Sequence, residues 1–271
     1  MPLHVTPDPS LKDALAAATR PLVGMWVSSG SALMAELCAG SGLDVVLLDG
    51  EHGPNGLESI LAQLQAVRSY PVMAVVRPPV NDPVIIKQYL DLGVQSLMVP
   101  MIHSVADAEA AVAAAHYPPR GVRGVGAALA RSSRWNRIPD YVERASETIT
   151  VMVQIESAQA VENVADILAV DGVDAIFLGP ADLAASMGLL GAQEDPAVLA
   201  AVDHCIAAAK AAGKPVGVNA FAEGAARHYL DAGAGLVLVG ADVTLLARGS
   251  EGLAATYIPQ WKPDGGSPSG W

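Results

Sequence analysis

Short apolar segments alternate along this chain with longer alanine- and leucine-rich segments of helical period. The alternation is typical of repeated βα units around a parallel sheet. Most of the short segments are apolar on both faces, as expected for strands covered by helices outside and by packed side chains inside. Eight in succession predict an α/β fold, a closed (β/α)8 TIM barrel forming a single domain over residues 1–271. The candidate strands are Leu22–Val27, Val45–Leu48, Val72–Val76, Ser96–Val99, Thr150–Ile155, Ala175–Leu178, Pro215–Val218 and Leu236–Val239.

Composition narrows the classes of protein that this chain could be. Hydrophobic residues make up 52% of the 271 residues and charged residues 16%, which is enough apolar material for a large core. The net charge of -12 repels phosphate backbones, so no nucleic-acid partner is expected. No apolar run approaches the roughly 20 residues that span a bilayer, so no membrane partner is expected. The amino terminus lacks a secretory signal, which predicts a cytoplasmic location.

Two further segments and the cysteines carry structural expectations. The gap between Val99 and Thr150 is unusually long, and it should hold a helix from about Ala106 to His116 and then a glycine- and arginine-rich loop. A loop of that length inside a compact domain usually has a function. Residues 258–271 are rich in glycine and proline and predict an extended C-terminal tail. Cys38 and Cys205 lie in helix-like segments, which favours buried free thiols over a disulfide.

The active site of a parallel barrel lies at the carboxyl ends of its strands, so polar residues just after each apolar run are informative. Two carboxylates, two histidines and an arginine converge there. They follow the second, third, fourth, fifth and sixth strands, and they are His52 (in the turn Asp49 to His52), Arg77, His103, Glu156 and Asp182.

Glu156 and Asp182 suit a hard divalent ion such as Mg2+ or Mn2+ that keeps water and substrate oxygens as its other ligands. Gln154, two residues before Glu156 on the same strand, points the same way. Asp182 could instead cap the helix that it begins. The turn Gly179–Asp182, which includes Pro180 and Ala181, places backbone N–H groups where a substrate carboxylate could bind. His103 is a weaker candidate for a third metal ligand.

Three further residues are candidates for catalysis. Arg77 leaves an apolar strand directly into two prolines, so its guanidinium could stabilise an enolate oxygen at the barrel mouth, although a structural salt bridge is the alternative. His52 lies in a glycine-flanked turn and suits proton transfer near neutral pH, or it is an ordinary loop histidine. Asp91 is a candidate to hold that imidazole, although its spacing alone would make it a solvated helix residue.

Lysine placement argues against Schiff-base chemistry, which needs a lysine projecting from a strand into the barrel. None of the lysines is placed in that way. They fall in the N-terminal segment, on helices, before a strand or in the tail, and they are Lys12, Lys87, Lys210, Lys214 and Lys262.

Several blocks resemble the HpcH/HpaI class II 2-oxo-acid aldolases, among them those that cleave 4-hydroxy-2-oxoheptanedioate. The blocks are LLDGEHGPN, VVRPPVNDPVIIKQYLDLG, YPPRGVRGVGAALARSSRWNRIPDY, VQIES and GVDAIFLGPADLAASMG, and the resemblance runs from about Leu11 to Leu253. It implies a divalent metal (Mg2+, Mn2+ or Co2+) on Glu156 and Asp182, with pyruvate held by Gln154 and the Ala181–Asp182 backbone. It also implies that His52 is the general acid/base, that Asp91 raises its basicity, and that Arg77 stabilises the transition state.

The resemblance further implies a homohexamer with swapped C-terminal helices, with the loop around Arg123 near a subunit boundary. The implied reaction is reversible cleavage to pyruvate and an aldehyde, which would be succinic semialdehyde in the catabolism of aromatic acids. Its negative charge calls for a cation near the mouth, such as Arg123 or Arg131. Asn219 and His103 stand where the chain departs from the family pattern, and both could touch the aldehyde side. The alternatives are 2-keto-3-deoxy sugar acids, a citramalyl-type thioester, or a binding barrel without chemistry.

Overall fold

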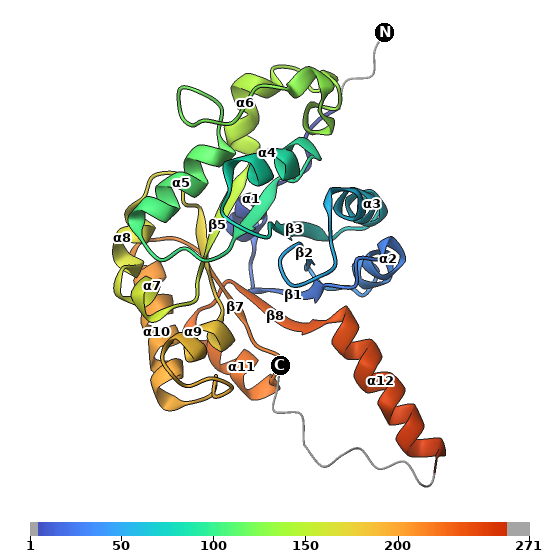
Figure 1. Ribbon diagram of the computed structural model, residues 1–271, viewed down its shortest axis with the longest axis vertical. Helices are drawn as coiled ribbons and strands as arrows, with labels where there is room; N and C mark the ends of the chain where they lie inside the picture. Colours follow the sequence, from blue (N-terminus) through green and yellow to red (C-terminus); the bar gives the residue numbers. More distant parts are fainter. Residues whose placement is uncertain (1–4, 259–271) are drawn as a thin grey trace.

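Eight parallel strands form a closed barrel in the computed structural model, which describes residues 5–258 (Figure 1). Each strand pairs with the next along the chain, and β1 pairs with β8 from Leu22↔Leu236 onward, which closes the cylinder. The predicted TIM barrel is therefore confirmed. The strands are β1 (Leu22–Val27), β2 (Val45–Asp49), β3 (Met73–Arg77), β4 (Ser96–Val99), β5 (Thr150–Ile155), β6 (Ala175–Leu178), β7 (Val216–Asn219) and β8 (Leu236–Ala241).

The last residue of several strands is polar, at the carboxyl end of the barrel. β2 and β3 each run one residue further than their apolar run, and their last residues pair in register as Asp49↔Arg77. β7 ends one residue later than predicted, at Asn219. The barrel ladder therefore sets the positions of these three side chains, because their backbone belongs to the sheet.

Helices cover the outside of the barrel. α4 begins as its sequence predicts, because Asp82 Oδ1 accepts from the N–H groups of Val84 and Ile85 at 2.9 and 3.0 Å, and Pro83 follows at the first helical position. The helices between strands are α2 (Ala32–Ala39), α3 (Leu57–Val67), α4 (Pro83–Asp91), α5 (Val105–Ala115), α7 (Ala158–Glu162), α8 (Val164–Ala169), α9 (Pro180–Ser186), α10 (Pro196–Ala211) and α11 (Glu223–Ala232).

The segment after α5 carries two short 3-10 turns, η1 (Ala127–Leu129) and η2 (Arg131–Ser133), and then α6 (Tyr141–Thr148). Arg134, Trp135 and Asn136 follow one another in the left-handed region, with φ of 53, 54 and 60°. α1 (Leu11–Ala17) lies beneath the barrel, where the Leu11 N–H donates to Ser96 Oγ at 2.9 Å. Since Ser96 begins β4, α1 covers the amino-terminal end of the strands.

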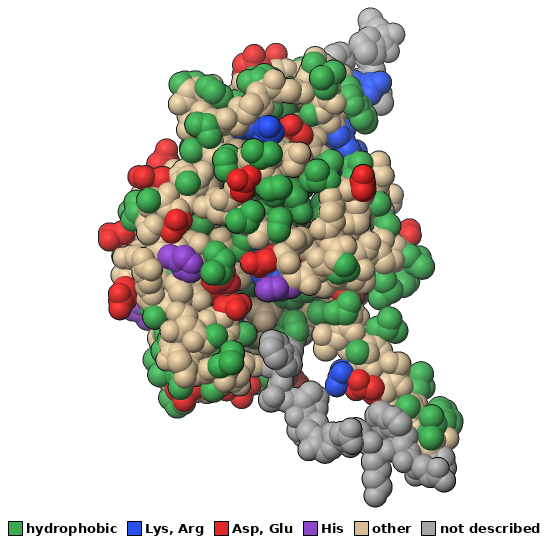
Figure 2. All heavy atoms as spheres, in the orientation of Figure 1, with side chains coloured by type: hydrophobic (Ala, Val, Ile, Leu, Met, Phe, Trp, Pro, Cys, Tyr) green, Lys and Arg blue, Asp and Glu red, His purple; other side chains and the backbone are tan. Residues whose placement is uncertain are grey.

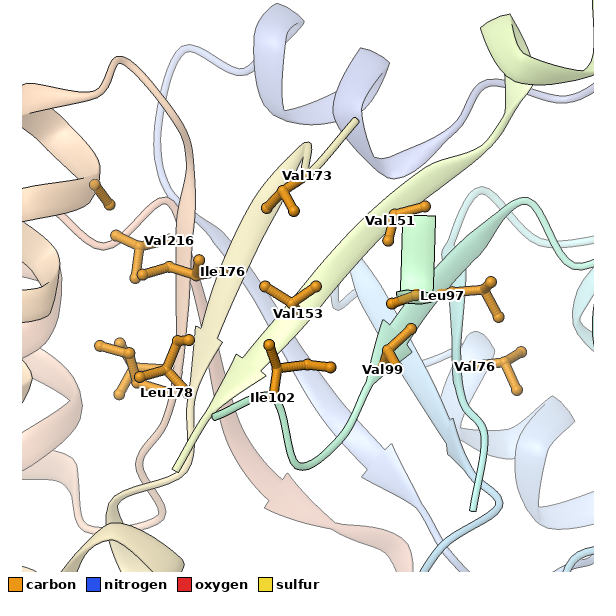
Figure 3. Packing of buried hydrophobic residues seen from close by; sticks show 14 of the residues in the cluster. Val76, Leu97, Val99, Ile102, Val151, Val153, Val173, Ile176, Leu178 and Val216 are labelled. Carbon is orange, nitrogen blue, oxygen red and sulfur yellow. The ribbon is translucent and has the colours of Figure 1, made fainter. Parts of the chain in front are cut away.

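Both faces of the strands are buried, which explains their apolar sequence. Outward-facing side chains such as Val99, Val153 and Ile176 belong to the cluster between strands and helices (Figure 3). A second cluster fills the inside of the barrel with Trp26, Phe177 and other side chains. Replacing a buried leucine or isoleucine in either cluster by alanine would cost about 2–5 kcal/mol.

α12 (Asp242–Tyr257) projects away from the barrel (Figure 1). Its first residue, Asp242, is buried, but Leu245, Leu246 and Leu253 have exposed fractions of 63%, 64% and 62%. Within residues 5–258, neither this helix nor any other is long and apolar enough to cross a membrane. Beyond Ile258, the predicted tail lies outside the described residues.

The cysteines agree with expectation. Cys38 and Cys205 are free and buried, and burial raises the pKa of Cys38 to about 11 and that of Cys205 to about 12. Neither thiol is therefore a thiolate at neutral pH.

Candidate active site

A cavity of about 540 Å³ opens among side chains that follow the strands, at their carboxyl ends. Most of the residues proposed from the sequence meet there: His52, Arg77, Gln154, Gly179, Pro180, Ala181 and Asp182. They come from the ends of β2, β3, β5 and β6, so the barrel brings together residues more than a hundred positions apart. The other lining side chains include Trp26, Ser28, Asp49, Phe177, Asn219, Phe221 and Tyr229.

Glu156 is a buried carboxylate just after β5, with an exposed fraction of 4%. Its Oε1 accepts from the Met101 N–H at 2.7 Å. Burial, with the charges of Asp182 and Glu51, raises the pKa of Glu156 to about 7, although that hydrogen bond and the charge of Arg77 act to lower it. Negative charge is thus concentrated at one point, and a bound cation would offset it.

The residues around Glu156 fit a hard divalent ion. Gln154 is buried, and its Oε1 has no hydrogen-bond partner among the described residues. No group of three or more His, Cys, Asp and Glu residues within 5–258 is arranged to hold a metal. An ion on Glu156 and Asp182 would therefore depend on water or substrate oxygens for the rest of its coordination, as Mg2+ commonly does.

Gly179 allows the start of α9 to approach these side chains. A Cβ at this position would lie 3.1 Å from Gln154 Nε2 and 3.1 Å from Glu156 Oε2. A larger residue would therefore push against both groups. Glycine here keeps the first turn of α9, with Asp182 in it, close to the end of β5.

Arg77 is held by carboxylates on two sides. Its Nε donates to Asp49 Oδ1 at 2.9 Å, its Nη2 lies 2.9 Å from Asp49 Oδ2, and its Nη1 lies 2.8 Å from Glu51 Oε2. The guanidinium also lies over the Trp26 ring, 4.3 Å from the centroid. Arg77 therefore forms the salt bridge considered from the sequence and also lines the cavity.

Asp49 and Glu51 received no role from the sequence, although both lie in the turn that drew attention after the second strand. Burial favours a raised pKa for Asp49, but the hydrogen bond and charge of Arg77, together with the Glu51 and His52 N–H groups, lower it. Burial raises the pKa of Glu51 despite the charges of Arg77 and His52. Sequence reasoning missed them because it cannot say which carboxylate an arginine on another strand will meet.

His52 lies at the rim of the cavity with a largely exposed side chain, and its Nε2 is 3.8 Å from Glu51 Oε2. Asp91, its proposed partner, ends α4 and accepts from Arg123 Nη2 at 2.6 Å. Within residues 5–258, Asp91 neither lines the cavity nor forms a hydrogen bond or ion pair with His52. The pairing of these two residues stays a prediction.

Four other residues named from the sequence do not line the cavity: Glu156, which lies behind Gly179, and His103, Arg123 and Arg131. His103 Nδ1 is hydrogen-bonded to Ser157 Oγ at 2.7 Å. The Arg123 side chain is completely buried beside Asp91, and Arg131 Nη1 donates to the Leu92 carbonyl at 2.7 Å. The expectation that Arg123 or Arg131 supplies a cation at this chain's own cavity was wrong, because both side chains are engaged elsewhere.

Known proteins of similar sequence identify the class of this barrel. Residues 22–249 match the family described as HpcH/HpaI aldolase/citrate lyase. The chain belongs to this family of enzymes, whose class II members generally use a divalent metal ion.

Its similarity to individual members is extensive. The chain is 52% identical over 258 residues to the 4-hydroxy-2-oxo-heptane-1,7-dioate aldolase of Salmonella arizonae, covering 95% of this chain and 98% of that protein. A crystal structure of an HpcH/HpaI family protein from Burkholderia cenocepacia J2315 is 40% identical with a TM-score of 0.87, covering 91% and 98% of the two chains. The citrate synthase SbnG is 27% identical with a TM-score of 0.82, covering 93% and 98%. Proteins similar to this chain thus include enzymes named for different reactions.

Proposed function

We propose that this protein is a divalent-metal-dependent class II aldolase that cleaves 4-hydroxy-2-oxo acids to pyruvate and an aldehyde, reversibly. The proposed substrate is of the 4-hydroxy-2-oxoheptanedioate type, giving succinic semialdehyde in aromatic-acid catabolism. The observation that carries the proposal is the buried Glu156 beside Gln154 and Asp182, in reach of a cavity that Arg77 and His52 also line. The relative from Salmonella arizonae, at 52% identity, supports the substrate.

Glu156 and Asp182 would hold the ion, which we expect to be Mg2+, Mn2+ or Co2+. The bound ion would supply positive charge for the 2-oxo oxygen as negative charge develops there. The Gln154 carboxamide and the backbone of Gly179–Asp182 would orient the pyruvate half. Because Arg77 uses three N–H groups on Asp49 and Glu51, two of its five remain to stabilise an enolate oxygen.

In cleavage, His52 takes the proton from the C4 hydroxyl, directly or through water. The C3–C4 bond breaks, its electron pair passes to the pyruvate half, and the C4 oxygen becomes the aldehyde carbonyl. Protonation at C3 then yields pyruvate. Synthesis runs in the opposite direction. Asp91 stays in this proposal as the residue that raises the basicity of His52, a role that requires a contact absent from residues 5–258.

We also propose that the protein is a homo-oligomer, a hexamer in which α12 packs on a neighbouring subunit. The exposed leucines of α12 support this, because an isolated apolar helix face is seldom left in water. The exposed side chains of Leu33 and Leu37 on α2, at 65% and 62%, offer a further apolar surface. The cytoplasmic location stays a prediction.

The deciding experiment is pyruvate release from racemic 4-hydroxy-2-oxoheptanedioate, coupled to lactate dehydrogenase. Protein stripped with EDTA should be inactive, and Mg2+, Mn2+ or Co2+ should restore activity. Full activity without metal would contradict the class II mechanism. Folded, metal-loaded protein that releases no pyruvate from this substrate would contradict the proposed acid.

A second candidate substrate class, the 2-keto-3-deoxy sugar acids, has one observation in its favour. Among the described cavity residues Arg77 is the only arginine or lysine, and two carboxylates already engage it. The cavity within one chain therefore offers no further arginine or lysine to a distal carboxylate. Comparing succinic semialdehyde with hydroxylated aldehydes as partners of pyruvate separates the two classes.

A further inference from the structure

The side-chain amino group of Asn219 is a hydrogen-bond donor, and the contact of Asn219 with Trp26 determines where that group points. It is the last residue of β7 and lines the cavity, and its Oδ1 accepts from Trp26 Nε1 at 2.8 Å. An indole N–H can only donate, so the carboxamide must turn its oxygen toward Trp26. The Nδ2 amino group therefore points away from Trp26, and this orientation follows from chemistry rather than from an arbitrary choice between O and N.

Trp26 holds this arrangement rigidly. Its ring meets Phe177 edge to face, with centroids 6.1 Å apart and planes at 85°, and the Arg77 guanidinium lies over it. Phe177 and Arg77 thus restrain the indole from two other strands. Because Trp26 is 8% exposed, its N–H needs the acceptor that Asn219 supplies.

The Asn219 amino group is available to a ligand. Within residues 5–258, Asn219 makes one side-chain hydrogen bond, the one to Trp26. The residue is partly exposed and lies at the cavity wall. A donor held in this way has lost its conformational freedom before a ligand arrives, which favours selective binding.

Asn219 lies on the strand next to the proposed pyruvate site. Pyruvate would lie against the ends of β5 and β6, and β7 is the next strand, paired with β6 at Leu178↔Val218. Beyond Asn219 the wall is apolar, formed by Ala220, Phe221 and Ala222. With pyruvate placed against β5 and β6 as proposed, a substrate atom near Asn219 would belong to the aldehyde.

We propose that Asn219 is a specificity-determining residue whose Nδ2 donates a hydrogen bond to an oxygen substituent of the acceptor aldehyde. This inference rests on the proposed aldolase function. It predicts that the enzyme prefers aldehydes carrying a hydroxyl or similar oxygen near the reacting carbon over alkyl aldehydes of the same size.

The test compares glycolaldehyde with propanal, which are nearly isosteric, as acceptors for pyruvate in the metal-loaded enzyme. The readout is the ratio of their kcat/KM values. Asn219→Leu should lower the preference for glycolaldehyde by about tenfold, the loss expected for one hydrogen bond. Asn219→Asp keeps an oxygen for the Trp26 N–H but removes the donor, so it should lose the preference as well. Leu190→Ala, at an exposed side chain of the same cavity wall without hydrogen-bonding atoms, is the matched control and should leave the ratio unchanged.

An unchanged ratio in Asn219→Leu overturns the proposal. A normal ratio in Asn219→Asp, with a reduced one in Asn219→Leu, also overturns it, because Asn219 would then act only through Trp26. Exchange of the pyruvate methyl protons with deuterated water separates this inference from the proposed function. If wild type and both variants still exchange these protons, the aldolase mechanism stands, whatever the ratio of kcat/KM values does. If the wild-type enzyme neither exchanges protons nor forms aldol product, the proposed function itself is contradicted.

Discussion

Arg77 shows how strongly single side chains depend on their partners in this site. Its guanidinium is 4% exposed and is held by Asp49, Glu51 and the Trp26 ring. The two carboxylates fix its orientation before substrate binds, so little reorganisation is needed when charge develops on the substrate. The same contacts mean that removing Arg77 would leave Asp49 buried without a counter-ion.

Arg77→Ala should abolish turnover, with kcat falling by about a thousandfold. It should also destabilise the fold by about 3–5 kcal/mol, because an unpaired carboxylate stays buried. Arg77→Lys keeps the charge but not the two-point contact with Asp49, so it should fold better and still lose most activity. Steady-state kinetics and thermal unfolding measure the two effects separately. An active Arg77→Ala enzyme would remove this residue from the mechanism.

The carboxyl group of Glu156 makes the stability of metal-free protein depend on pH. Burial raises its pKa to about 7 in the folded state, from an ordinary value of 4.5. A raised folded pKa means that folding favours the protonated form, so this stability is present below about pH 4.5 and is lost as pH rises through about 7.

EDTA-treated wild type should therefore lose stability between pH 5 and pH 8, by up to about 3 kcal/mol from this group. Glu156→Gln should lack that part of the pH dependence and bind the ion poorly. Thermal unfolding at the two pH values, in both proteins, measures the difference. Equal pH dependence in wild type and Glu156→Gln would contradict the raised pKa.

Among the elements, the start of α9 depends on the glycine before it. Gly179 sits where a Cβ would press on the side chains of Gln154 and Glu156, so any larger residue would have to displace these two groups. The position of Asp182 relative to Glu156 follows from this close approach of α9 to the two side chains.

Gly179→Ala should weaken Mn2+ binding by about tenfold or more, because displaced ligands cost metal affinity. Binding can be measured by titration with EPR detection of free Mn2+. Gly224→Ala on α11 is the matched control, since a Cβ there meets nothing within 4 Å. That control should leave Mn2+ affinity unchanged and slightly stabilise the helix. Wild-type affinity in Gly179→Ala would mean that the close approach does not matter to the metal site.

α12 differs from the other long helices because its first residue anchors it and most of its length is exposed. The Asp242 carboxylate accepts from the N–H groups of Ser28 and Ser29 at 2.8 and 3.2 Å, which ties the base of α12 to the loop after β1. The leucines further along the helix are exposed. The base is therefore fixed on the barrel while the apolar face needs another surface.

At the scale of the whole molecule, that face predicts assembly. Leu246→Glu would place a charge in a buried interface, and the oligomer should dissociate or lose affinity by at least a hundredfold. The barrel should stay folded, because Leu246 is exposed within one chain. Ala255→Glu, at an exposed position on the side of the helix opposite Leu246, is the control. Light scattering after size exclusion gives the mass of each species, and a monomeric wild type at micromolar concentration would refute the assembly.

The surface charge of the molecule agrees with its composition. On the face drawn in Figure 2, acidic side chains are spread widely and basic ones are few, in keeping with the net charge of -12. Such a surface attracts divalent cations weakly and repels anionic substrates at low ionic strength. The cavity therefore has to bind its substrate through specific contacts.

Much of this architecture could be predicted from the sequence. β1, β4, β5 and β6 have the bounds expected from their apolar runs, because a strand buried on both faces is apolar at most of its positions. Because all parallel strands end at the same rim, the residues at the ends of the apolar runs were expected to line one cavity, and Arg77, Gln154 and Asp182 do so.

Only the tertiary structure decided which side chains pair. Arg77 meets Asp49 and Glu51, Asp91 meets Arg123, and Trp26 meets Asn219 across 193 positions of sequence. Periodicity assigns a residue to a face and a strand end, but it carries no information about barrel closure, register or rotamer. Those three determine the distances between side chains on different strands, and hydrogen bonds and ion pairs form only over the last few ångströms.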